Sequence, residues 1–184
     1  MQFGLSEEQI LLQDNVNRFL KDNVPLETVR KYAEEGNDSE IWQGLVDLGI
    51  PALLIPEEQG GLGMTPMDAA ITAESLGYHV APSPFLGSAI MGPVALSRSA
   101  EDHSELLGQI IEGKTRIGIA FGESVGNRND ASVIVESGKM NGKSIFAFDL
   151  EANHYLVADK TKNLYLVDAQ AAGLEKKELV TVDK

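Results

Sequence analysis

The sequence predicts an α+β protein of more than one domain, with an all-α N-terminal helical bundle followed by an antiparallel, β-barrel-like domain. Its 184 residues, 43% of them hydrophobic, are enough for one or two folded domains. Residues 1–114 have a net charge of −12, whereas residues 115–184 have a net charge of −1. The hydrophobic pattern changes from helical to alternating spacing near Gly113–Thr115. These two changes coincide, so we expect domains at 1–114 and 115–184.

The first part of the sequence, residues 1–114, contains several signals that are typical of helix starts. Ser6 and Gln9 form a capping-box pattern ahead of apolar residues at helical spacing. Thr65-Pro66-Met67-Asp68 combines a capping threonine, a proline at the first helical position and an acid in the first turn, and Gly77 is expected to end that helix. Further helices are predicted from about Ser39 to Gly49 and from Ser99–Asp102 to Gly113.

Short alternating segments without intervening helices fill the second part. Such segments are typical of an antiparallel barrel or sandwich. Asn141-Gly142 is predicted to form a hairpin turn, because both residue types tolerate a positive φ. The predicted strands are 117–121, 132–136, 144–148, 154–158, 163–167 and 178–182.

Charge and composition exclude several function classes. The net charge is −13 and the isoelectric point is near 4.6, which disfavours binding to nucleic acid or to an anionic membrane. No apolar run approaches the ~20 residues of a transmembrane helix, and the polar N-terminus does not resemble a signal or transit peptide. The absence of cysteine excludes disulfides and thiolate metal sites. We therefore expect a cytoplasmic protein without nucleic acid or membrane partners.

Two motifs that often carry chemistry favour ordinary structural roles here. Gly122-Glu123-Ser124-Val125-Gly126 matches the G-x-S-x-G pattern of hydrolases, but the required helix after the serine is replaced by a turn-like segment, so a loop is favoured. His79, His103 and His154 lack metal-ligand spacing, so no metal site is expected.

The order of several segments resembles the acyl-CoA dehydrogenase family along the whole chain. Leu5–Gln9 matches its "L-S-E-E-Q" start, and Leu45–Gly63 matches "L-x-x-L-G-(I/W)-x-x-x-x-I-P-E-E-x-G-G-x-G" almost throughout. Glu74–Gly77 matches "E-x-L-G", and Leu106–Lys114 matches the helix that leads into the family's β domain. Ala152–Ala158 is similar to its "A-D-x-x-L-V-A" strand, with Asn153-His154 in place of Ala-Asp.

The resemblance implies a flavoprotein that binds FAD and oxidises an acyl-CoA thioester to the 2,3-enoyl-CoA. In the family, a helical domain and a middle β domain precede a C-terminal helical domain that carries the glutamate base. Residues 1–114 would then be the N-terminal helical domain, and 115–184 a middle β domain truncated before its end. No residue here matches the base, so we expect the 184-residue chain alone to be inactive. Family members are oligomers, so a homo- or hetero-oligomer is expected.

The resemblance also implies four cofactor-binding residues: Phe121, Gly122, Phe146 and Phe148. The family's flavin-contacting "T-E-P" reads Gly122-Glu123-Ser124 here, and its "W/F-I-T/S" reads Phe146-Ala147-Phe148. The hydroxyl side chains that the family has at the positions of Gly122 and Phe148 are therefore absent from this sequence. Phe146 retains an aromatic face for the flavin. Phe146–Asp149 is similar to the "F-V-L-D" of bacterial relatives that handle bulky or steroid-derived acyl-CoAs, so fatty acid or steroid side-chain catabolism is the expected setting.

Three functional hypotheses follow. The first is a piece of a longer acyl-CoA dehydrogenase. The second is a short, non-catalytic partner subunit that docks on a full-length homologue, and the third is a related flavin oxidase or monooxygenase. The apolar stretch at 80–86 either lines an acyl pocket or packs in the helical core, and the core is favoured because apolar stripes usually pack inward.

Overall fold

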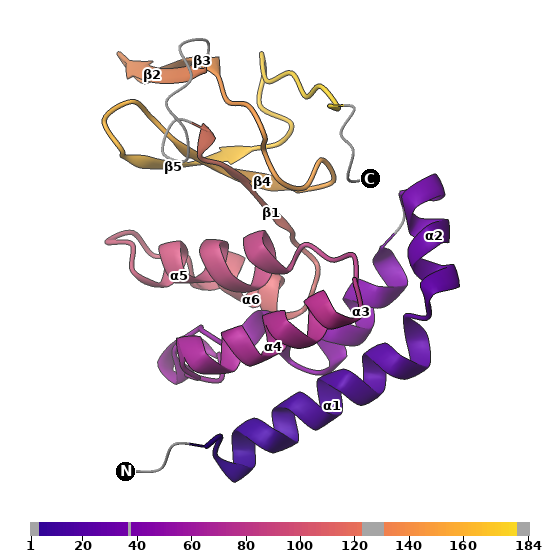
Figure 1. Cartoon of the computed structure of the whole chain (residues 1–184). Helices are drawn as coiled ribbons and strands as arrows, with labels where there is room; N and C mark the ends of the chain where they lie inside the picture. Colours follow the sequence, from indigo (N-terminus) through magenta and orange to yellow (C-terminus); the bar gives the residue numbers. More distant parts are fainter. Residues whose placement is uncertain (1–3, 37, 123–130, 180–184) are drawn as a thin grey trace.

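The computed structural model describes residues 4–36, 38–122 and 131–179. Helices make up the first part of the chain and strands the second, and Figure 1 shows the strands as a layer beside the helices. The predicted α+β class is confirmed. The helices are α1 (Glu7–Asn23), α2 (Leu26–Glu35), α3 (Ser39–Asp47), η1 (Ile50–Ala52), η2 (Glu57–Gln59), α4 (Pro66–Tyr78), η3 (Leu86–Met91), α5 (Gly92–Ser97) and α6 (Ser104–Ile111).

Local sequence signals explain where α1 and α4 begin. The Ser6–Gln9 and Thr65–Asp68 capping boxes are both present, at the starts of α1 and α4. The expected end of α4 at Gly77 is not observed. The helix continues to Tyr78, and the backbone turn that ends it is formed by the residues after Tyr78. α2 was not predicted, since no side chain caps it and its start is marked only by Pro25.

The helical core lies between α1, α3, η1 and the end of α4. Trp42 and Leu45 on α3 pack there with Leu20 of α1. Phe85 from the apolar stretch at 80–86 belongs to the same cluster, as the core interpretation predicted, whereas Val80 and Leu86 are exposed. Burial of this apolar surface is the main stabilising contribution to the helical region.

The strands form two separate sheets. β1 (Ile117–Ala120), β4 (His154–Ala158) and β5 (Leu164–Asp168) form one, in the order β1-β4-β5, and β2 (Ser132–Glu136) pairs with β3 (Lys139–Lys143) in the other. β1 and β4 are parallel, which corrects the expectation of a purely antiparallel arrangement. All four residues of β1 are buried, as is usual for a parallel strand that is covered on both faces.

Two further predictions in the β region are wrong. The segment 144–148 is not a strand. Among the described residues only Phe148 forms a bridge, with Ile119, because positive φ angles at Phe146 and Asp149 interrupt the extended backbone. The hairpin turns at Ser137-Gly138, where both φ angles are positive as a two-residue hairpin requires, so Asn141-Gly142 lies within β3. The segment predicted at 178–182 begins as an irregular chain at 178–179, and the rest lies outside the described residues.

The first sheet and the helices share a core. Ile117 and Ile119 of β1 and Leu156 of β4 pack in one cluster with residues of α5 and α6. The Ile117 amide also donates a hydrogen bond of 2.9 Å to the Ser88 hydroxyl on η3. The boundary between 1–114 and 115–184 is therefore bridged by continuous packing, and the independence of the two parts stays a prediction.

Candidate cofactor site

The four residues expected to bind the cofactor lie together at the end of β1. Phe121 and Gly122 directly follow this strand, and the segment 144–148 runs along its free edge. The Phe148 amide donates to the Ile119 carbonyl at 2.9 Å, and the Ile119 amide donates back to the Phe148 carbonyl at 3.3 Å. The Gly122 amide donates to the Ser144 hydroxyl at 3.3 Å. These contacts join two stretches of chain that are more than 20 residues apart.

Gly122 is required at this position by the close approach of the two segments. A Cβ atom added there would lie only 2.8 Å from the Ile145 carbonyl oxygen and 3.1 Å from the Ser144 hydroxyl oxygen. Any side chain would therefore push the segment at 144–148 away from β1.

Two phenylalanine rings are exposed beside this junction. Phe146 is 51% and Phe148 is 54% exposed, whereas Phe121 is half-buried and packs against the core shared with the helices. Exposed aromatic faces of this kind suit a planar ring system that stacks on them. The exposed rings and the glycine beside them fit one wall of a flavin site.

The backbone that carries the two rings is in an unfavourable conformation. Phe146 has φ 56° and Asp149 has φ 66°, in the left-handed region that side chains with a Cβ rarely adopt. Tyr155 holds the end of the segment by donating its hydroxyl to the Asp149 carbonyl at 2.8 Å. Burial, assisted by the charges of Asp149 and Glu151, raises the pKa of Tyr155 to about 12, so it is neutral and able to donate at physiological pH.

A buried ion cluster, formed by Asp38, Arg116 and Asp149, lies beside the segment. The Arg116 guanidinium donates to both Asp38 carboxylate oxygens at 2.7 and 3.1 Å and to both Asp149 oxygens at 2.8 and 3.0 Å. Its side chain is 19% exposed and those of the two aspartates 7%. Burial alone would lower the pKa of Arg116, but the hydrogen bonds that its guanidinium donates to the two carboxylates outweigh it and raise that pKa. Burial and the Asp38 charge also raise the pKa of Tyr32.

Sequence reasoning missed this cluster. Arg116 lies 78 residues from Asp38 and 33 residues from Asp149. Asp38 and Arg116 belong to no motif, and Asp149 was singled out only as the last residue of Phe146–Asp149. The only signal was indirect: a single arginine directly precedes an apolar strand, where a buried position requires a partner for its charge.

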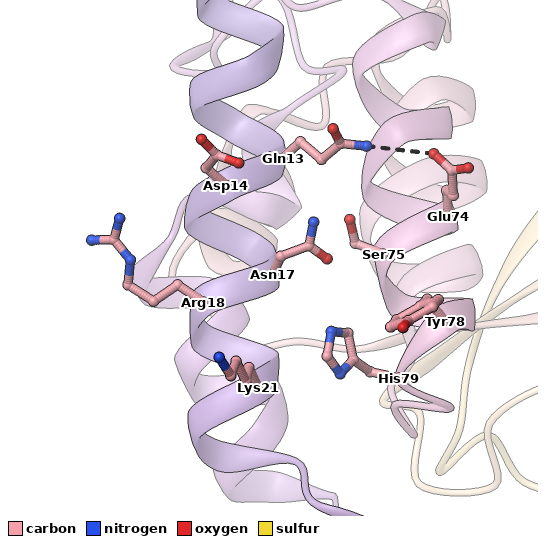
Figure 2. Close-up of a pocket in the computed structure, with 9 residues that line it drawn as sticks. All are labelled: Gln13, Asp14, Asn17, Arg18, Lys21, Glu74, Ser75, Tyr78 and His79. Atoms are coloured by element: carbon pink, nitrogen blue, oxygen red, sulfur yellow. Dashed lines mark hydrogen bonds between the residues drawn. The ribbon is translucent and has the colours of Figure 1, made fainter.

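A groove of about 630 Å³ lies between α1 and α4 (Figure 2). None of the four expected cofactor residues lines it. The Gln13 side chain bridges the groove with a hydrogen bond of 3.4 Å to Glu74. Ser75 is buried beside it, and its hydroxyl oxygen has no partner among the described residues. Charges of both signs line the walls: Asp14, Arg18, Lys21 and Glu74. The groove can accept polar groups, but its mixed charges select no particular ligand.

The remaining sequence motifs lie apart from the site. Ser124 of the G-x-S-x-G pattern is outside the described residues. His79 ends α4, His103 precedes α6 and His154 begins β4, so the three histidines are on separate elements. None of the described helices combines the length and the apolar character that crossing a lipid bilayer requires.

Sequence comparison assigns the chain to a known family. Residues 6–114 match the model of the acyl-CoA dehydrogenase N-terminal domain, which is more than half of the chain. The protein therefore belongs to the acyl-CoA dehydrogenase family. It is 32% identical over 149 residues to acyl-CoA dehydrogenase IpdE2 of Mycolicibacterium smegmatis, which covers 79% of this chain and 46% of that protein. The protein of the same name from Mycobacterium tuberculosis is 33% identical over 110 residues, or 58% of this chain and 34% of that protein.

Solved structures share the fold. The ChsE4–ChsE5 complex from Mycobacterium tuberculosis superimposes with a TM-score of 0.84 at 24% identity, covering 98% of this chain and 52% of that one. The FAD complex of PigA has a TM-score of 0.76 at 20% identity, with the same coverage of 98% and 52%. The chain thus spans about half the length of the relatives it matches.

Proposed function

We propose that this chain forms one wall of an FAD site in an enzyme that oxidises an acyl-CoA thioester to the 2,3-enoyl-CoA. The observation that carries the proposal is the pair of exposed rings, Phe146 and Phe148, held beside Gly122 at the end of β1. The family membership supports it, as does the similar fold of a protein solved as an FAD complex.

These three residues would contribute to binding the flavin and not to the chemical step. The rings of Phe146 and Phe148 would stack on or flank the flavin, and the backbone at Gly122 would approach it closely. Bound FAD would supply the acceptor for the hydride that leaves the β carbon of the substrate. A carboxylate that removes the α proton is needed as well, and we assign none within this chain.

A reconstitution experiment tests the proposal. The purified protein is mixed with FAD, and retention of the flavin absorption bands is measured after gel filtration. We expect Phe146→Ala and Phe148→Ala each to weaken FAD binding by about 3- to 10-fold, the loss of one aromatic contact. Tyr78→Ala is the matched control, because Tyr78 is an aromatic residue that is 84% exposed and lies outside the site. Wild-type protein that binds no flavin, alone or with its partner, would contradict the proposal.

A second candidate is a non-catalytic subunit that supplies this wall to a partner chain. The exposure of Phe146 and Phe148 favours it, because two exposed rings on one segment suit contact with another surface. A solved relative of similar fold is itself a two-protein complex, ChsE4–ChsE5. Retention of flavin only after a full-length homologue is added would favour the subunit. An oxidase or monooxygenase would instead consume oxygen with the reduced flavin, which an oxygen electrode detects.

A further inference from the structure

Among the described residues, the segment that carries Phe146 and Phe148 belongs to no regular strand. It forms one isolated bridge, between Phe148 and Ile119, instead of a continuous strand pairing. It also includes Phe146 with a positive φ and is followed by Asp149 with another. Such backbone angles persist only where surrounding contacts enforce them.

Arg116 provides four hydrogen bonds among these contacts. Its guanidinium presents a planar array of donors, and two pairs of hydrogen bonds engage Asp38 on one side and Asp149 on the other. Asp38 precedes α3 in the helical region, and Asp149 directly follows Phe148. The cluster therefore links the ring-bearing segment to the helices through the residue that directly precedes β1.

We propose that Arg116 is a positioning residue for the cofactor site. By binding Asp38 and Asp149 together, it fixes the segment of Phe146 and Phe148 beside the end of β1. This inference rests on the proposed function for the identity of the ligand, but the positioning itself can be measured without any ligand. Lysine cannot replace it fully, because an ammonium group lacks the planar array that engages two carboxylates at once.

Native-state hydrogen exchange tests the positioning. The Phe148 amide reports directly on the segment, because it donates to the Ile119 carbonyl at 2.9 Å. In Arg116→Met we expect this amide to exchange about 10-fold faster or more, while amides between β4 and β5 keep their rates. Arg116→Lys should give an intermediate rate. Arg98→Met is the matched control, because Arg98 is an exposed arginine near the end of α5.

FAD titration of the same variants gives the second readout. Arg116→Met should weaken FAD binding by about 10-fold, and Arg116→Lys should restore part of the affinity. If Arg116→Met does not fold, Asp38→Asn replaces it, because this change removes the negative charge and one acceptor oxygen on the helical side and leaves the Arg116–Asp149 pair in place. Asp38→Asn should then speed Phe148 exchange selectively.

The outcomes separate the two proposals. Unchanged Phe148 exchange, or a uniform rise across all amides, would overturn the positioning role whatever the flavin result. If the Phe148 amide exchanges selectively faster but all variants bind FAD with equal affinity, the positioning role of Arg116 for the cofactor site would also be overturned. Selective exchange in a protein that binds no FAD would support the positioning and overturn the proposed function instead.

Discussion

The helical and the β regions of this protein are stabilised in different ways. In the helical region, α1 and α4 begin at local capping boxes, and each backbone hydrogen bond within the helices joins residues a few positions apart. In the β region, β1 pairs with β4 across 37 residues, and the segment bearing Phe146 and Phe148 is held by Arg116 and Tyr155. Contacts between neighbours along the chain therefore shape the scaffold, whereas distant contacts shape the candidate site.

The largest predicted effect tests whether the two regions unfold together. Leu156 of β4 is buried in the cluster that β1 shares with α5 and α6, so Leu156→Ala should lower the free energy of unfolding by about 2–5 kcal/mol. Trp42 is the single tryptophan and lies in the helical core, so its fluorescence follows the helices. We expect the denaturation midpoint from Trp42 to fall in this strand variant.

The exposed Leu164 of β5 supplies the control for that experiment. Leu164→Ala should change the free energy of unfolding by no more than about 0.5 kcal/mol. If Leu156→Ala leaves the Trp42 transition in place while the strands unfold earlier, the regions are independent domains, as the charge boundary near Gly113–Thr115 predicts.

A smaller effect is expected from the local signals of the helical region. Thr65→Ala removes half of the capping box of α4 and should cost about 1 kcal/mol. Burial alone would raise the pKa of Asp68, but the hydrogen bonds from Thr65 outweigh it and lower that pKa. Because the folded pKa lies below the unfolded one, this stabilisation is present at neutral pH and is lost as the pH falls through the acid range.

Urea denaturation at neutral pH and at about pH 3 measures the difference between wild type and Thr65→Ala. The two proteins should differ at neutral pH, and the difference should become smaller in acid. An equal difference at both pH values would show that the Asp68 carboxylate does not contribute through this cap.

The smallest effect concerns a distant contact in the β region. Tyr155→Phe removes the hydrogen bond to the Asp149 carbonyl and should cost roughly 0.5–1.5 kcal/mol at neutral pH. The pKa of Tyr155 in the folded protein, about 12, lies above the ordinary value of 10.0. This contribution is therefore complete below about pH 10 and is lost as the pH rises from about 10 toward 12.

Unfolding measured across this alkaline range should show a steeper loss of stability in wild type than in Tyr155→Phe. Tyr78→Phe, at an exposed position, should follow the wild-type curve. Parallel curves for wild type and Tyr155→Phe would mean that the phenol titrates as it does in the unfolded chain.

The sequence by itself determined the α+β class, the starts of α1 and α4, the buried role of Phe85 and the family. These features depend on caps, apolar spacing and motif order, all of which are read within short stretches of chain. It also named Phe121, Gly122, Phe146 and Phe148, whose role in binding FAD stays a prediction.

Only the tertiary structure decided how those four residues come together. The parallel pairing of β1 with β4, the interrupted strand at 144–148 and the Asp38–Arg116–Asp149 cluster each depend on partners more than 20 residues apart. The alternating pattern at 144–148 favoured a strand, but positive φ angles at Phe146 and Asp149 replaced it with an anchored, irregular segment. The physical reason is that burial of Arg116 and its two carboxylates requires them to be paired, and neither partner is adjacent to Arg116 in the sequence.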